Sequence, residues 1–192
     1  MKVFLLDNFD SFTFMLKDYV EQCGADCIVK RNDDDFVNIE NSLDGFDAII
    51  ISPGPKTPSL SGSLMKIIST YHQKKPILGV CLGHQGIGEF FGAKLIKAKL
   101  PRHGKVDKVD LFNHLLFEGI KEKIEVTRYH SLLLEDVKSP LHVIARSDKN
   151  EVMAIAHEAL PVYGIQFHPE SHMTKEGVIL IRNFLKLSKE LA

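Results

Sequence analysis

The sequence predicts an α/β protein with a mixed, mostly parallel central sheet flanked by helices and an added antiparallel β section. Two observations support this prediction. In the first half, short apolar runs alternate with helical stretches, which is typical of βαβ units and a parallel sheet. In the second half, strand-like runs follow one another with little helix between them, which indicates added antiparallel strands. The 192 residues fit a single domain, residues 1–192, with a sizeable core.

Local signals bound the elements of the first half. Ser11 is a candidate N-cap for the first helix, and Gly24 ends that helix. The run 48–51 has no polar interruption, as expected for a strand buried on both faces. The predicted strands are residues 3–6, 27–29, 48–51 and 77–80. The predicted helices are residues 11–22, 62–71 and 84–91.

The second half is predicted as a series of strands closed by one amphipathic helix. Apolar residues recur at helical spacing between positions 178 and 185, so we expect a helix over residues 175–188. The predicted strands are residues 95–98, 106–111, 124–128, 142–146, 152–157 and 162–167.

Composition excludes several classes of function. A formal net charge of -1 argues against binding to nucleic acid or another polyanion. The apolar run at the N-terminus meets a charge at Asp7, which is too early for an export signal, and no window is long enough to span a membrane. Three cysteines, an odd number, favour free thiols and a cytoplasmic location. We find no spacing of ligands typical of a metal site and no phosphate-binding loop, so no cofactor is expected.

The sharpest chemical signal is the segment 79–83, Gly-Val-Cys-Leu-Gly, which has the form of a nucleophile elbow with Cys81 as the nucleophile. A strand must turn abruptly into a helix there, and Gly79 and Gly83 remove the β-carbons that would clash. The thiol then stands at a helix N-terminus, where the dipole and free N–H groups favour thiolate. The alternative is a buried structural cysteine beside two chance glycines. Cys23 and Cys27 lack this setting and are expected to be packing residues.

A cysteine nucleophile needs a base, and His168 is the best candidate. It follows a predicted strand, and Pro169 keeps the segment extended, so Glu170 can reach an imidazole nitrogen and orient the ring. The alternative is a surface histidine beside a turn proline. His84 and His130 are the rivals, and both are better explained as wall residues or structural hydrogen-bonding groups.

With these two motifs together, the chain resembles the class I (triad) glutamine amidotransferases. Within that family it is similar to the small subunits of anthranilate synthase and aminodeoxychorismate synthase. The resemblance covers nearly the whole chain, and it implies a flavodoxin-like sheet and a triad of Cys81, His168 and Glu170. The matching blocks are residues 7–13, 52–55, 79–85, 128–132 and 164–171.

The resemblance also implies roles for substrate-binding residues. The backbone N–H groups of Gly54 and Leu82 would form the oxyanion hole, Gln85 would bind glutamine, and the backbone of Ser131 and Leu132 would hold its α-amino and α-carboxylate end. Without the family, simpler explanations would serve. Gly54 would belong to a rigid turn, Gln85 would be an exposed helix residue, and Ser131 would lie at a strand end. The family loop usually has glycine where this chain has Lys56, so a positive φ there would strain the lysine.

The function implied is hydrolysis of glutamine to glutamate and ammonia, with the ammonia delivered to a chorismate-utilising synthase subunit in a hetero-oligomer. Two alternatives remain. The chain could be a catalytically silent regulatory or binding subunit with the same fold, or a stand-alone cysteine hydrolase acting on γ-glutamyl compounds. A silent subunit would not react with a label that alkylates only a competent thiolate. A stand-alone hydrolase would be highly active without a partner, whereas a synthase subunit should be weak alone and stimulated by its synthase.

Overall fold

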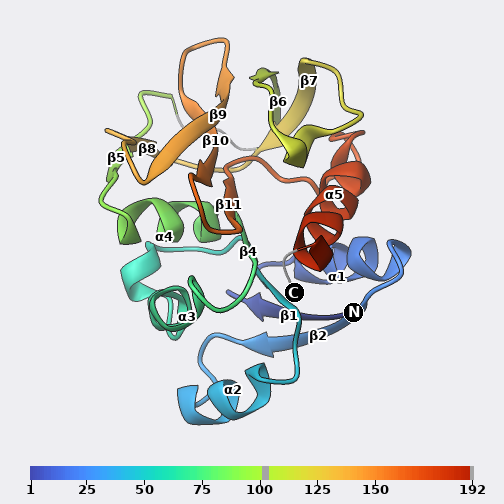
Figure 1. Cartoon of the computed structure of the whole chain (residues 1–192). Coiled ribbons are helices and arrows are strands. Elements are labelled where there is room, and N and C mark those ends of the chain that lie inside the picture. Colours follow the sequence, from blue (N-terminus) through green and yellow to red (C-terminus); the bar gives the residue numbers. More distant parts are fainter. Residues whose placement is uncertain (101–103, 191–192) are drawn as a thin grey trace.

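The computed structural model describes residues 1–100 and 104–190, and within them one nine-stranded sheet forms the centre of the molecule (Figure 1). Its strand order is β2-β1-β3-β4-β11-β10-β9-β6-β7. Neighbours from β2 to β4 and the pair β4–β11 are parallel, whereas the pairs from β11 to β7 are antiparallel. The predicted fold class is confirmed. The strands of the sheet are β1 (Lys2–Asp7), β2 (Asp26–Arg31), β3 (Ala48–Ile51), β4 (Ile77–Val80), β6 (Lys105–Leu111), β7 (Lys123–Arg128), β9 (Leu141–Ser147), β10 (Val152–His157) and β11 (Val162–Ile165).

Helices cover both faces of the parallel half of the sheet (Figure 1). Helices α1 and α5 pack on one face, and α2, α3 and α4 pack on the other, as the membership of two separate hydrophobic clusters shows. The α-helices are α1 (Thr13–Gln22), α2 (Phe36–Leu43), α3 (Leu64–Tyr71), α4 (Leu82–Phe90) and α5 (Gly177–Glu190), and the short 3-10 helices are η1 (Pro58–Leu60) and η2 (Leu115–Phe117).

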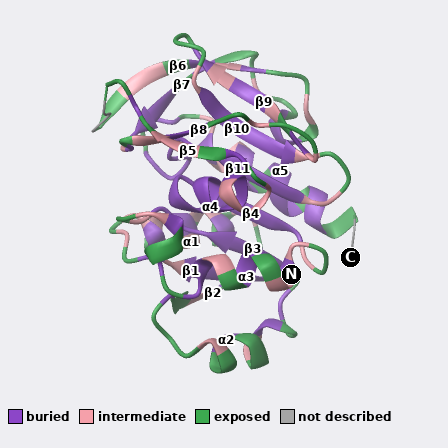
Figure 2. Cartoon of the chain, turned by 90° about the vertical axis from the view of Figure 1, so that its left-hand side faces the viewer, coloured by how far each residue is buried: buried purple, intermediate pink, exposed green. Residues whose placement is uncertain are grey.

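The strands that end near the predicted nucleophile are deeply buried (Figure 2). All residues of β3 and β4 are buried, and so are the four central residues of β1. This confirms the prediction for residues 48–51, where an uninterrupted apolar run indicated packing on both faces. A rigid, doubly covered strand end is a good support for a reactive side chain.

The second half contains the expected antiparallel strands, with two differences. Strand β11 pairs in parallel with β4 and antiparallel with β10, so it joins the two halves of the sheet. It also ends at Ile165, two residues earlier than predicted. In addition, β5 (Lys94–Lys97) pairs with β8 (Leu132–Glu135), a strand the sequence did not predict, and forms a separate two-stranded sheet.

Several helix boundaries also differ from prediction. Ser11 is not the N-cap, because α1 begins at Thr13 with Phe12 as the capping residue and without a side-chain cap. The carboxylate of Asp10 instead accepts from the Phe12 N–H at 2.9 Å, and Asp7 accepts from the Thr13 hydroxyl at 2.7 Å. Helix α2 was not predicted at all, whereas α3, α4 and α5 lie within two residues of the predicted bounds.

In the part of the chain that the structure describes, no helix is both long enough and apolar enough to cross a membrane. The assignment of residues 1–192 to a single domain stays a prediction.

Candidate active site

Cys81 lies at a sharp turn between β4 and α4, as the elbow motif predicted. Its backbone is in a rare conformation, with φ 50° and ψ -96°, and α4 begins at the next residue. A Cβ on Gly83 would lie 2.6 Å from the backbone oxygen of Ile51, so no larger residue fits there without a shift. The Cys81 N–H donates to the carbonyl oxygen of Ile165 at 2.8 Å, which ties the turn to β11. The strained backbone of Cys81 is therefore held in place by contacts with β3 and β11.

His168 and Glu170 are in direct contact, as predicted. The distance between His168 Nδ1 and Glu170 Oε1 is 2.5 Å, and both side chains are almost completely buried. The backbone N–H of His168 donates to the carbonyl oxygen of Thr127 at 3.0 Å, in an isolated bridge to β7. The segment is not extended as expected, because Pro169 and Glu170 form a turn after that bridge.

The charge state of His168 follows from two opposing effects. Burial lowers the pKa of His168, but the interactions with Cys81 and Glu170 outweigh burial and raise it well above 6.5. Nδ1 is occupied by Glu170, so Nε2 is the nitrogen available to the sulfur; it is buried and makes no hydrogen bond of ordinary geometry to the described residues. An imidazolium beside a thiolate is the state in which a cysteine nucleophile is active.

A cavity of about 160 Å³ opens beside the sulfur. Its volume corresponds to about five water molecules, which suits one small polar ligand. Four of the predicted binding residues line it with Cys81, whereas Leu82, His168 and Glu170 do not. The lining residues are Gly54, Pro55, Lys56, Cys81, Gln85, Tyr129, His130, Ser131 and Leu132. A larger cavity of about 680 Å³ beside β5 and β8 contains none of the predicted site residues, so its size alone does not make it the candidate.

Gly54 is held against the elbow by a buried polar cluster. The Asn8 N–H donates to the Ser52 hydroxyl at 2.9 Å, and the Asn8 amide donates to the Ser52 carbonyl oxygen at 2.9 Å. A Cβ on Gly54 would lie 2.6 Å from the Asn8 backbone oxygen and 3.0 Å from Leu82 Cδ2. The two predicted oxyanion-hole residues are therefore close together. Lys56 has φ 70°, so the lysine adopts the conformation that glycine tolerates best.

The rival histidines are poor candidates for the base. Burial lowers the pKa of His84 to about 3, against a smaller opposing interaction with the Gly164 backbone. Burial and the Arg128 charge also lower the pKa of His130 to about 3, and both of its ring nitrogens are hydrogen-bonded. His130 is thus a structural hydrogen-bonding group, as expected.

The other cysteines are free thiols away from the cavity. Burial raises the pKa of the Cys27 thiol to about 12 and also raises the pKa of the Cys23 thiol. Both are therefore poor nucleophiles at neutral pH, in agreement with their predicted role in packing.

Two site residues were not predicted. Gln166 is completely buried; its amide nitrogen lies 3.6 Å from the Cys81 sulfur, and its amide oxygen accepts from Gln85 Nε2 at 3.3 Å. Its position two residues before His168 was the available signal. Arg128 is also completely buried and contacts His130, but an arginine at the end of a strand gave no sequence signal for burial.

Known proteins are similar to this chain over nearly its whole length. The family model for class-I glutamine amidotransferases matches residues 4–187. The aminodeoxychorismate/anthranilate synthase component 2 of Bacillus subtilis is 40% identical over 96% of this chain and 95% of its own length. The anthranilate synthase component 2 of Saccharolobus solfataricus is 44% identical over 94% of this chain and 96% of its own length. A crystal structure from Thermoplasma acidophilum, described as that of a putative GMP synthase subunit, superposes with a TM-score of 0.89, 30% identity, and coverage of 100% of this chain and 95% of that chain.

Proposed function

Because this chain belongs to the class-I glutamine amidotransferase family, we propose that it hydrolyses glutamine through Cys81 and supplies the ammonia to a chorismate-utilising synthase subunit. One observation carries the chemical part of this proposal. A cysteine on a strained turn lines a small cavity, and it interacts with a buried histidine that a buried carboxylate orients.

The first half of the reaction forms a covalent intermediate. The Cys81 thiolate attacks the side-chain amide carbon of glutamine, and the carbonyl π electrons move to oxygen. The backbone N–H groups of Gly54 and Leu82 stabilise this oxyanion, a contact typically worth about 3–4 kcal/mol of barrier. The tetrahedral adduct collapses when His168 gives its proton to the leaving nitrogen, which departs as ammonia and leaves a γ-glutamyl thioester. Proton transfer of this kind contributes roughly 10²–10⁴-fold in rate.

The second half returns the enzyme to its starting state. Neutral His168 takes a proton from water, the hydroxide attacks the thioester carbon, and the C–S bond breaks to release glutamate and the thiolate. The balance is one glutamine and one water converted to one glutamate and one ammonia. Glu170 keeps His168 aligned throughout and balances its positive charge.

The substrate's amino-acid end is assigned to the rest of the cavity wall. We place the α-amino and α-carboxylate groups against the backbone of Ser131 and Leu132, and the substrate amide beside Gln85. Gln85 Nε2 lies 3.3 Å from the Leu132 carbonyl oxygen, which supports a shared role for these residues.

The partner is proposed from the relatives. The Bacillus subtilis relative is named for both aminodeoxychorismate and anthranilate synthase, and the Saccharolobus solfataricus relative for anthranilate synthase alone. Ammonia is mostly protonated at neutral pH, so direct transfer within a hetero-oligomer preserves the nucleophile. We propose that this chain serves tryptophan synthesis, folate synthesis or both, with identification of the product from chorismate and glutamine as the deciding assay.

The test of the chemical proposal is Cys81→Ala, with Cys27→Ala as the matched control. In the complex, Cys81→Ala should abolish glutamine-dependent product formation and leave ammonia-dependent formation intact, whereas Cys27→Ala should retain both. Persistent glutaminase activity in Cys81→Ala would refute the assignment. Failure of a γ-glutamyl affinity label to alkylate the wild-type chain would instead favour a silent subunit, and high activity without a partner would favour a stand-alone hydrolase.

A further inference from the structure

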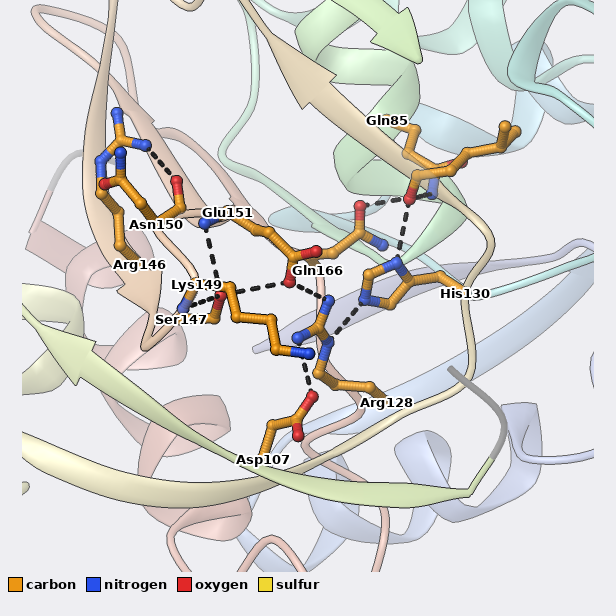
Figure 3. Close-up of polar contacts among 11 residues, drawn as sticks. Gln85, Asp107, Arg128, His130, Arg146, Ser147, Lys149, Asn150, Glu151 and Gln166 are labelled. Carbon is orange, nitrogen blue, oxygen red and sulfur yellow. Dashed lines mark hydrogen bonds and ion pairs between the residues drawn. The ribbon is translucent and has the colours of Figure 1, made fainter. Parts of the chain in front are cut away.

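Arg128 is the largest of the completely buried side chains, and its guanidinium has a partner on every side (Figure 3). Nη1 donates to Asp107 Oδ2 at 2.8 Å, and Nη2 donates to Glu151 Oε2 at 2.6 Å. Nε donates to Nε2 of His130 at 3.0 Å. An arginine side chain has donors only and keeps its charge, so the nitrogen of His130 that it contacts must be the acceptor.

This contact determines the tautomer of His130. With Nε2 acting as acceptor, the proton resides on Nδ1, which donates to the Leu132 carbonyl oxygen at 2.9 Å. Gln85 Nε2 donates to the same oxygen at 3.3 Å, so both lone pairs of the Leu132 carbonyl oxygen are used. The Leu132 carbonyl is therefore held by a chain of groups that begins at a buried cation.

Leu132 and Ser131 form part of the wall of the cavity beside Cys81. We propose that Arg128 and His130 are positioning residues, in which Arg128 holds His130 as the neutral Nδ1–H tautomer and His130 holds the Leu132 wall where the amino-acid end of glutamine binds. This inference rests on the proposed function, because it assigns a purpose to the cavity wall. The inference adds Arg128 and His130 as the residues that determine the shape of the wall.

The surrounding charges explain why this arrangement is stable. Asp107 comes from β6, and Glu151 from the turn between β9 and β10, where the Ser147 hydroxyl also donates to Glu151 at 3.1 Å. Two carboxylates thus flank the buried cation, while burial and the Arg128 charge lower the pKa of His130 and keep its ring uncharged. The antiparallel half of the sheet in this way holds a residue of the cavity wall.

The decisive variants are His130→Asn and His130→Gln, because each keeps one of the two hydrogen bonds of the ring and loses the other. An asparagine amide nitrogen occupies the place of Nδ1 and can still donate to Leu132. A glutamine amide oxygen reaches the place of Nε2 and can still accept from Arg128, but glutamine then has no donor atom at the place of Nδ1. Glutamate release is measured on the full chain, alone and with its co-purified synthase subunit.

We expect His130→Gln to raise the KM for glutamine by about 3- to 10-fold, the range of one hydrogen bond, with a much smaller change in kcat. His130→Asn should raise KM less. The rate at which iodoacetamide alkylates Cys81 should be unchanged in both, since this reagent has no amino-acid end. If His130 served only in packing, His130→Asn would raise KM more than His130→Gln, because asparagine fills less of the histidine volume than glutamine.

Arg128→Lys supplies a second measurement if either His130 variant fails to fold. Lysine keeps the positive charge between the carboxylates but lacks the rigid Nε–H, so KM should rise as in His130→Gln. Unchanged KM in the folded variants, the reverse order, or slower alkylation by iodoacetamide would each overturn the inference. A wild-type chain that releases no glutamate overturns the proposed function, which is a separate result.

Discussion

The contact between Glu170 and His168 allows a quantitative test by the substitution Glu170→Gln. Glutamine preserves the size and the hydrogen-bonding capacity of the side chain but removes its charge. Glu170 is completely buried, and its second oxygen, Oε2, has no hydrogen-bond partner among the described residues. The 2.5 Å contact with His168 Nδ1 is therefore the interaction that the substitution weakens most.

The magnitude follows from the type of hydrogen bond. A hydrogen bond between charged groups contributes about 1.5–3 kcal/mol, compared with about 1 kcal/mol for a neutral one. If this energy is realised when His168 is an imidazolium, replacing the charged bond by a neutral one costs about 0.5–2 kcal/mol and reduces kcat by about 2- to 30-fold. The KM for glutamine should change little, because Glu170 does not line the cavity.

The pH dependence has a definite sign. Burial alone lowers the pKa of His168, and the interactions with Cys81 and Glu170 raise it above its ordinary value. The imidazolium is therefore present at low and neutral pH and is lost as the pH rises through the raised value. Removing the Glu170 charge lowers the pKa of His168, so the alkaline loss of activity should move to lower pH.

The assay is the pH profile of glutamate release together with the pH profile of Cys81 alkylation. Glu125→Gln is the matched control, because Glu125 is an exposed carboxylate on β7 and should leave both profiles unchanged. A Glu170→Gln enzyme with wild-type kcat and an unmoved alkaline limb would refute the reasoning.

Three further predictions concern the loop, the buried cation and the core. Gly54→Ala should lower glutaminase kcat by about 10²–10³-fold with ammonia-dependent synthesis retained, because its Cβ would lie 2.6 Å from the Asn8 backbone oxygen; a normal kcat would contradict the oxyanion assignment. Arg128→Met should lower the free energy of unfolding in urea by about 3–5 kcal/mol, while Lys186→Met in an exposed ion pair should leave it nearly unchanged; equal effects would contradict the burial argument. Phe184→Ala should cost about 3–5 kcal/mol in the same measurement, since this side chain is completely buried on α5, and a loss below about 1 kcal/mol would contradict its place in the core.

Sequence patterns were most informative where the determining residues are neighbours in the chain. The strand 48–51 and the strand 77–80 were predicted with their observed bounds, because uninterrupted apolar runs report burial directly. The strained turn at Cys81 followed from two glycines within two residues of it. The contact between His168 and Glu170 was predicted for the same reason, although a turn and not an extended segment brings the side chains together.

Prediction failed where a short pattern had more than one solution. Helix α2 has only two buried residues, Ile39 and Leu43, so its apolar stripe is too brief to distinguish from a loop. Strand β8 was missed because its four residues depend on pairing with β5, which lies more than thirty positions earlier in the chain.

By itself, the sequence determined the fold class, the buried strands of the parallel half, the strained turn at the nucleophile and the pairing of His168 with Glu170. Only the tertiary structure decided that Gln166 contacts Cys81, that Gly54 lies against Leu82, and that a buried Arg128 holds His130. The physical reason is the range of the interactions. Periodicity and turn chemistry act over a few residues, whereas these contacts depend on the register between strands that are distant in the chain.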